Sequence, residues 1–259
     1  MPPPPFPLAP EVPVGDAVYP AERVLAVLAP YLSDARRAVI DRVVAARTFS
    51  VVPVLEGLVD AGNVNAVLRS AEGLGYGAAH LVGLVADAAE LVAHYVAGED
   101  ASSVRARRAA ARASSGAHKW VELDAWDDPV AYVEAAHAAG YRVAVTALRD
   151  DALPVEDWDF TVPTALVVGN EQDGVSDALL EAADAALRLP LDGFVQSYNV
   201  SVAAALALHH ARLDRLRRTG RHADLTPDQR HLLTAHYVAR AVPLAAPILE
   251  EAARRETTA

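Results

Sequence analysis

The pattern of hydrophobic and polar positions changes near residue 50. From there to about residue 218, short apolar runs alternate with longer segments in which apolar positions recur every three or four residues. Short apolar runs are typical of buried strands, and the longer spacing is typical of amphipathic helices. Strands that alternate with helices over roughly 170 residues predict an α/β fold, with a mostly parallel sheet covered by helices on both faces.

The individual elements follow from this pattern and from capping signals. We expect strands over residues 50–55, 79–84, 141–147, 164–168 and 186–189. We expect helices over residues 64–74, 100–113, 129–139, 177–183 and 199–219. Asp128-Pro129 and Ser176-Asp177 are N-cap signals for two of these helices, and Gly140 ends the first of them.

The two ends of the chain differ from this central part. The first nineteen residues are rich in proline and predict a disordered or extended lead-in, followed by a helical stretch over 21–46 that breaks at Pro30. After Gly220, the segment from Thr226 to Gln229 has capping-box spacing and predicts a helix to about residue 243 and a last helical piece. We therefore expect three parts, residues 1–48, 49–219 and 220–259.

Composition excludes several classes of protein. The 259 residues contain no cysteine, so there is no disulfide framework, thiol nucleophile or zinc-thiolate site, and we predict no metal site. No apolar run approaches the roughly 18–20 residues of a membrane span. The proline-rich amino terminus lacks the features of a signal peptide. We expect a soluble, cytoplasmic protein.

The net charge of −11 argues at first against a nucleic-acid partner, but the basic residues are clustered. One cluster holds Arg105, Arg107, Arg108, Arg112 and Lys119, and the other holds Arg212, Arg215, Arg217, Arg218, Arg221 and His222. Either cluster taken alone is also compatible with a solvated helix face. Two such clusters in an acidic chain favour an RNA contact.

Common catalytic motifs are missing. The glycine-rich run over residues 73–77 comes at the end of a helix and before a strand, which is the wrong order for a dinucleotide loop. We expect this run, with Gly75 in it, to be a helix C-cap and turn. No serine lies in a Gly-x-Ser-x-Gly elbow. His209 and His210 are adjacent on a helix and point about 100° apart, so they do not share a metal.

Three other segments concentrate polar residues at the ends of predicted elements. The first runs from Asn63, a candidate N-cap, to Arg69, with Asn65, Arg69 and Glu72 expected on the polar side of a helix. A cap plus an Arg69–Glu72 pair on a wet surface is the alternative interpretation.

The second and third segments each follow a predicted strand. Residues 169–176 read Gly-Asn-Glu-Gln-Asp-Gly-Val-Ser, and a polar loop after a parallel strand is where α/β folds bind ligands. We expect both glycines to let a ligand approach the backbone. Residues 189–201 read Leu-Pro-Leu-Asp-Gly-Phe-Val-Gln-Ser-Tyr-Asn-Val-Ser, which is more polar than a helix cap requires.

Together, and in this order, the three segments resemble the signature motifs of the SpoU/TrmH family of SPOUT RNA methyltransferases. They match the patterns Asn-x-x-Ala-x-x-Arg, Gly-x-Glu-x-x-Gly-x-Ser and Ile-Pro-Met-x-Gly-x-x-x-Ser-Leu-Asn-Val-Ser, with leucines at 189 and 191 and Tyr198 as mild departures. Residues 114–120, Ser-Ser-Gly-Ala-His-Lys-Trp, are similar to the branch that methylates tRNA guanosine. Asp60-Ala61-Gly62 stands where that branch often has His and Pro.

The resemblance implies a fold, a reaction and a set of residues. It implies a carboxyl-terminal deep trefoil knot, a homodimer, and S-adenosylmethionine-dependent ribose 2′-O-methylation of RNA, with tRNA favoured. The implied catalytic residues are Asn63, Arg69, Glu171, Ser197 and Asn199. The implied cofactor contacts are Thr146, Gly169, Leu189, Ser197 and Tyr198. The expected RNA contacts are Arg105, Arg107, Arg108, Arg112, His118, Lys119, Arg215 and Arg218.

Three alternatives stay open at this point. The first is a 23S ribosomal RNA methyltransferase, although such relatives commonly carry an extra amino-terminal domain of about a hundred residues. The second is a non-catalytic RNA-binding homodimer, which the presence of all five implied catalytic residues disfavours. The third is an NAD-dependent oxidoreductase, which the missing glycine fingerprint disfavours.

Overall fold

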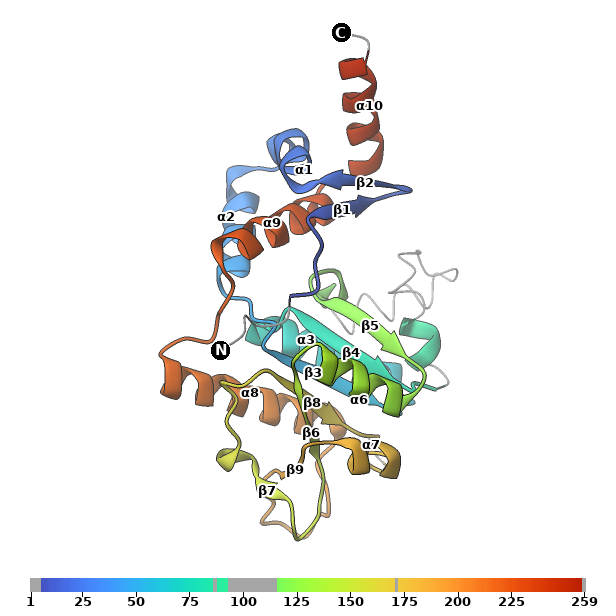
Figure 1. Ribbon diagram of the computed structural model, residues 1–259, viewed down its shortest axis with the longest axis vertical. Coiled ribbons are helices and arrows are strands. Elements are labelled where there is room, and N and C mark those ends of the chain that lie inside the picture. Colours follow the sequence, from blue (N-terminus) through green and yellow to red (C-terminus); the bar gives the residue numbers. More distant parts are fainter. Residues whose placement is uncertain (1–5, 86–87, 93–115, 171, 258–259) are drawn as a thin grey trace. The chain divides into compact units, whose positions relative to one another are not determined.

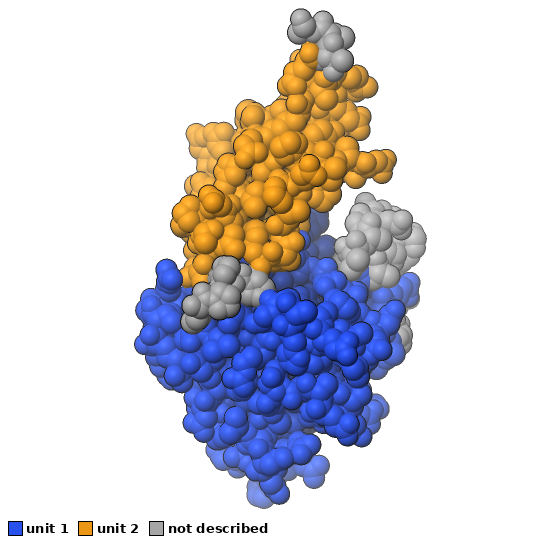
Figure 2. All heavy atoms as spheres, viewed as in Figure 1, with its two compact units in different colours: residues 1–5, 48–222 blue, residues 6–47, 223–259 orange. Residues whose placement is uncertain are grey.

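A computed structural model describes residues 6–85, 88–92, 116–170 and 172–257. These residues form two compact units (Figure 2). One unit holds Thr48–His222, and the other holds Phe6–Arg47 together with Ala223–Ala259. The described residues before Thr48 and after His222 therefore form one unit, and the predicted α/β region forms the other.

The first unit is built on a seven-stranded sheet in which every neighbouring pair is parallel (Figure 1). The strand order is β5-β4-β3-β8-β6-β9-β7. The strands are β3 (Val51–Glu56), β4 (Ala78–Val82), β5 (Glu122–Trp126), β6 (Arg142–Thr146), β7 (Leu153–Pro154), β8 (Thr164–Val168) and β9 (Ala185–Arg188). The predicted parallel α/β sheet is thus confirmed, and its five predicted strands lie within two residues of their expected bounds.

The sheet has two strands that the sequence pattern did not reveal. β5 is an edge strand whose residues are all partly or fully exposed, so it has no continuous apolar run. β7 has only two residues, one of them Pro154, and lies at the other edge. Proline is tolerated at sheet edges because it lacks the N–H that a central strand needs.

Helices cover both faces of the sheet. α3 (Ala61–Leu74) and α8 (Val200–Thr219) pack against each other on one face. α6 (Pro129–Ala138) and α7 (Asp177–Ala182) pack together on the other face (Figure 1). There Tyr132 of α6 forms a hydrogen bond with His80 of β4. The expected caps are confirmed for α6 at Asp128, for α7 at Ser176 and for the end of α3 at Gly75.

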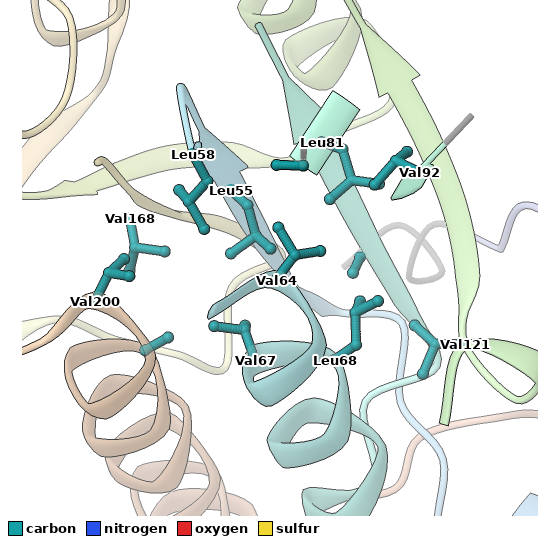
Figure 3. Packing of buried hydrophobic residues seen from close by; sticks show 13 residues of the cluster. Leu55, Leu58, Val64, Val67, Leu68, Leu81, Val92, Val121, Val168 and Val200 are labelled. Atoms are coloured by element: carbon teal, nitrogen blue, oxygen red, sulfur yellow. The ribbon is translucent and has the colours of Figure 1, made fainter. Parts of the chain in front are cut away.

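The core under α3 and α8 explains why these two helices stay on that face. Figure 3 shows Val64, Val67 and Leu68 of α3 pointing toward Leu55 of β3 and Leu81 of β4. The remaining members of this buried cluster are Leu58, Ala79, Ala88, Val92, Val121, Val168, Val200 and Ala204. Since α3 and α8 begin beside the carboxyl ends of the strands, this packing fixes their amino-terminal ends at one edge of the sheet.

The second unit contains the hairpin β1 (Glu11–Val14) and β2 (Ala17–Pro20), the helices α1 (Ala21–Leu28) and α2 (Asp34–Ala45) joined by a 3-10 turn (Ala29–Tyr31), α9 (Pro227–Ala241) and α10 (Ala245–Thr257). The helix break near Pro30, the Ser33 cap and the Thr226–Gln229 capping box are confirmed. Part of the extended lead-in proves to be a two-stranded hairpin that turns at Gly15, whose φ is +62°.

No single helix in the described ranges is long and apolar enough to cross a membrane. Among these residues, only α9 and α10 taken together have the length and hydropathy of a span, and they are bent by 107° relative to each other.

The helix expected over residues 100–113 lies outside the described residues.

Candidate active site at the carboxyl edge of the sheet

Three of the implied cofactor residues come from neighbouring strands. Thr146 is the last residue of β6, Gly169 follows β8, and Leu189 follows β9. β6 lies between β8 and β9 in the sheet, and its partners in both are parallel to it. Carboxyl ends of parallel strands meet at one edge, which is the ligand-binding edge of open α/β sheets. The structure therefore places these three residues side by side at that edge.

The loop after β8 folds back on itself at Gly169. A β-carbon at this position would lie 2.1 Å from the carbonyl carbon and oxygen of Gly174 and 2.2 Å from the nitrogen of Val175. Asn170 and Gly174 exchange two backbone hydrogen bonds of 3.0 and 3.2 Å. The sequence suggested that Gly169 leaves room for a ligand, but the atoms that fill its missing side-chain position belong to its own loop. Gly174 has a φ of +74° and open space around it.

The side chain of Asn170 shapes the middle of the same loop. Its Oδ1 accepts hydrogen bonds from the backbone nitrogens of Gln172, at 2.8 Å, and Asp173, at 2.7 Å. Such an Asx turn holds a loop in one conformation without help from other elements. The predicted catalytic residue Glu171 lies outside the described residues.

Asn63 of the first segment and Asn199 of the third meet, although 136 positions separate them. The Nδ2 of Asn199 donates to the Oδ1 of Asn63 at 3.3 Å. The Oδ1 of Asn199 accepts from both the backbone nitrogen and the hydroxyl of Ser201, at 2.9 and 2.6 Å. Because Ser201 occupies the oxygen of the Asn199 amide, the nitrogen of that amide faces Asn63.

The first segment differs from expectation in two details. Asp60, and not Asn63, caps α3, because the carboxylate of Asp60 accepts from the backbone nitrogen of Gly62. Asn65 was expected on the polar side of the helix but is only 2% exposed.

Arg69 is exposed and makes no hydrogen bond or ion pair with any residue in the described ranges. Its guanidinium therefore faces solvent at this site.

The third segment is largely exposed at the same edge. Ser197 is exposed, and the hydroxyl of the half-buried Tyr198 donates to the carbonyl oxygen of Pro190 at 2.8 Å. Asn199 is the N-cap of α8, as its sequence position allowed. Tyr198 thus ties the two ends of the loop that joins β9 to α8.

The expected RNA contacts fall into three groups. Arg105, Arg107, Arg108 and Arg112 lie outside the described residues. His118 and Lys119 form a 3-10 turn (Ala117–Lys119) that packs against α3, and burial, with a smaller effect of the Lys119 charge, lowers the pKa of His118.

The structure corrects the expectation for Arg215. Its side chain is buried, with the residue 5% exposed, and its guanidinium donates to the carbonyl oxygens of Phe160 at 3.0 Å and His222 at 3.2 Å. Arg218 is half-exposed but donates to the buried Asp214 at 2.8 Å, and this hydrogen bond raises the pKa of Arg218. Arg215 therefore holds the end of α8 in place, and only the outer part of this basic cluster is open to a partner.

Three polar residues at this edge were not among the site residues expected from the sequence. Glu56, the last residue of β3, is buried and accepts from the backbone nitrogen of Ser176 at 2.9 Å. Asp60 and Ser201 have the capping and orienting contacts described above. In the sequence, Glu56 could have been found as an acid that ends an apolar run, and Asp60 as a capping residue type before a helix. Ser201 could have been found as the last serine of the third segment.

The arrangement suits a reaction that needs positioning. It offers an exposed guanidinium, two linked amides and an exposed hydroxyl beside loops that a cofactor can contact. No three His, Cys, Asp or Glu side chains gather to hold a metal ion within the parts of the chain that the structure describes.

Comparisons with known proteins agree with the motifs. The profile of the SpoU rRNA Methylase family matches residues 50–209. The tRNA (guanosine(18)-2′-O)-methyltransferase of Thermus thermophilus is 34% identical over 185 residues, which cover 71% of this chain and 86% of that enzyme.

Two solved structures share the fold. The TrmH/SpoU tRNA modifying enzyme of A. aeolicus superposes with a TM-score of 0.66 at 24% identity, over 81% of this chain and 98% of the other. The SpoU methyltransferase AviRb of Streptomyces viridochromogenes, in complex with the cofactor AdoMet, gives a TM-score of 0.51 at 26% identity, over 68% of this chain and 64% of the other.

The loop after β8 predicts unequal costs for alanine substitution at its two glycines, Gly169 and Gly174. Gly169→Ala should lower the free energy of unfolding by roughly 2–3 kcal/mol, because its β-carbon has no space among backbone atoms. Gly174→Ala should cost about 1 kcal/mol, since only its left-handed backbone is unfavourable. Urea unfolding followed by circular dichroism measures both, and equal costs would contradict the close approach at Gly169.

Proposed function

The chain belongs to the SpoU rRNA Methylase family and is an S-adenosylmethionine-dependent RNA 2′-O-methyltransferase, and we propose that its substrate is tRNA, at a guanosine. The relatives' names support tRNA: the Thermus thermophilus enzyme acts on a tRNA guanosine, and the A. aeolicus protein is a tRNA modifying enzyme. Such an enzyme would work in the cytoplasm.

The observation that carries the site assignment is the contact between Asn63 and Asn199. It joins the first and third segments at the edge where Thr146, Gly169 and Leu189 lie side by side. Loops after three adjacent strands suit an elongated cofactor such as S-adenosylmethionine. The proposed contacts are backbone groups of Gly169 and Leu189, together with Thr146, Ser197 and Tyr198. When bound, the cofactor supplies a methyl group that its sulfonium charge already activates.

The chain's own residues then have two tasks. A ribose hydroxyl is a poor nucleophile while protonated, so a group must share or remove its proton, and the oxygen must be aligned with the methyl group. We assign substrate positioning to Arg69, whose exposed guanidinium suits a backbone phosphate better than a proton, because arginine stays charged. Asn63, Glu171, Ser197 and Asn199 complete the proposed catalytic set.

RNA would bind through local basic groups, because a net charge of −11 gives little long-range attraction. We propose Arg105, Arg107, Arg108 and Arg112 for this contact, together with His118, Lys119 and the half-exposed Arg218. Arg215 is left out, since its guanidinium is engaged inside the first unit.

We also propose a homodimer and a knotted chain. Val202 and Leu206, one turn apart on α8, are 46% and 43% exposed, and Phe194 and Val195 in the loop before α8 are more exposed still. Exposed apolar residues at i and i+4 next to small alanines are typical of a helix that packs on another. The trefoil knot would involve the loops after β8 and β9, as expected from the family.

The substrate proposal is tested by methylating separated pools of RNA. With labelled S-adenosylmethionine, we expect transfer to unmodified tRNA and little to ribosomal RNA. Transfer to ribosomal RNA alone would favour the alternative substrate. Cofactor binding without transfer to either pool would support the non-catalytic RNA-binding alternative.

The role of Arg69 is tested by two substitutions. Arg69→Ala should lower kcat for methyl transfer by at least about a hundredfold, and Arg69→Lys should also be poor because an ammonium does not reproduce the planar fork. Affinity for S-adenosylmethionine and thermal stability should stay near wild type, since Arg69 is exposed and makes no hydrogen bond or ion pair with a described residue. Near-normal turnover of the alanine variant would refute the assignment.

The dimer is tested by adding charge to α8. In sedimentation velocity at micromolar concentration, wild type should be a dimer and V202E/L206E a monomer, because two carboxylates would be buried without partners. Val39→Glu is the matched control, since Val39 is 39% exposed on α2 in the other unit. A monomeric wild type, or a double variant that stays dimeric, would overturn this interface.

A further inference from the structure

We propose that Glu56 is a positioning residue for cofactor binding, which holds the loop after β8 (the glycine loop, described at residues 169–170 and 172–176) against the end of β3 at Ser176. The inference rests on the proposed function, in which Gly169 contacts S-adenosylmethionine. Glu56 itself lies outside the three motif segments and has no part in the catalytic set proposed above.

The first observation is that Glu56 is buried although it is a carboxylic acid. It is 4% exposed, at the carboxyl end of a central strand whose other residues are all buried and mostly apolar. Burying a carboxylate is costly unless hydrogen bonds compensate for the lost water. An apolar residue would extend the strand at lower cost, so the carboxylate at this position calls for a specific partner.

The partner is the backbone of the loop. The Oε2 of Glu56 accepts from the backbone nitrogen of Ser176 at 2.9 Å, across 120 positions of sequence. Ser176 is the last residue of the loop and the N-cap of α7. A hydrogen bond to a charged acceptor is stronger than one between neutral groups. Glu56 therefore fastens the far end of the loop to β3.

The near end of the loop is held by the sheet. Val168 pairs with Leu55, so the loop leaves β8 directly beside Glu56. Gly57 lies next to the loop as well, since a β-carbon there would be 3.5 Å from the Nδ2 of Asn170. Between these two ends, the Asn170–Gly174 pairing and the Asx turn set the shape of the loop.

The conformation of the glycine loop and its position on the sheet therefore depend on different hydrogen bonds. The hydrogen bonds of Asn170 hold the described part of the loop together, while the Glu56 carboxylate holds the far end of the loop on the sheet edge. Without the carboxylate, the Ser176 N–H loses its acceptor, and the loop can tilt away from β6 and β9, where the other cofactor contacts lie. A small displacement of a binding loop weakens ligand affinity more than it weakens the fold.

The test compares two variants of similar size. Glu56→Gln keeps an oxygen that can accept from Ser176, whereas Glu56→Met fills the space without an acceptor. By calorimetry, Glu56→Met should bind S-adenosylmethionine roughly tenfold more weakly or worse, the loss of one charge-assisted hydrogen bond, and Glu56→Gln within about threefold of wild type. The KM of Glu56→Met for S-adenosylmethionine should be raised, while its kcat at saturating cofactor stays within a few-fold of wild type.

Asp214→Leu is the matched control. Asp214 is also a buried acid, 5% exposed, and it also accepts from a backbone nitrogen, that of Phe160 at 3.1 Å. It lies fifteen residues along α8 from Asn199, roughly 22 Å at 1.5 Å per residue. Asp214→Leu should lower the melting temperature and leave the cofactor affinity unchanged.

Different results would contradict the role of Glu56 and the proposed function. Wild-type affinity in Glu56→Met, or equal weakening in Glu56→Met and Asp214→Leu, would overturn the role of Glu56. A wild-type chain that does not bind S-adenosylmethionine would overturn the proposed function itself. If Glu56→Met does not fold, hydrogen exchange in the wild type carries the test: a slowly exchanging Ser176 amide supports the bond, and one that exchanges as fast as a solvent-exposed amide contradicts it.

Discussion

The close approach of backbone to backbone at Gly169 is the constraint on which the rest of the site depends. With Gly174 atoms 2.1 Å from where a β-carbon would be, only glycine allows the chain to turn back immediately after β8. That turn returns the chain to the sheet edge at Ser176, where α7 begins and Glu56 accepts the backbone N–H. The position of a whole loop thus follows from one missing side chain and one buried carboxylate.

A second set of contacts joins elements that are far apart in the sequence. Ser201 orients the amide of Asn199, and that amide contacts Asn63 near the start of α3. α3 and α8 also share a buried apolar cluster, so the polar contact and the hydrophobic packing hold the same two helices together. An enzyme whose chemistry is mainly alignment needs such rigid support, because a small misplacement of reacting groups costs much of the rate.

The sequence predicted the sheet and most helix starts because buried parallel strands are continuous apolar runs and caps are local. It could not predict contacts that depend on neighbours in space. Arg215 looked like one more member of a basic cluster, and only its carbonyl partners from Phe160 and His222 show that it is internal. Asn63 and Asp60 are both good capping residues, and the choice between them depends on where α3 begins. Glu56 falls just outside the strand expected over residues 50–55, and its partner lies 120 positions away, so the pattern gave no sign of its role.

The central claim is that the carboxyl edge of β6, β8 and β9 binds S-adenosylmethionine. Hydrogen exchange of the whole chain with and without saturating cofactor tests it most directly. The account predicts slower exchange concentrated in the segments that follow these strands, around Thr146, Gly169 and residues 189–198. Protection confined to other segments, or no change on adding the cofactor, would contradict it.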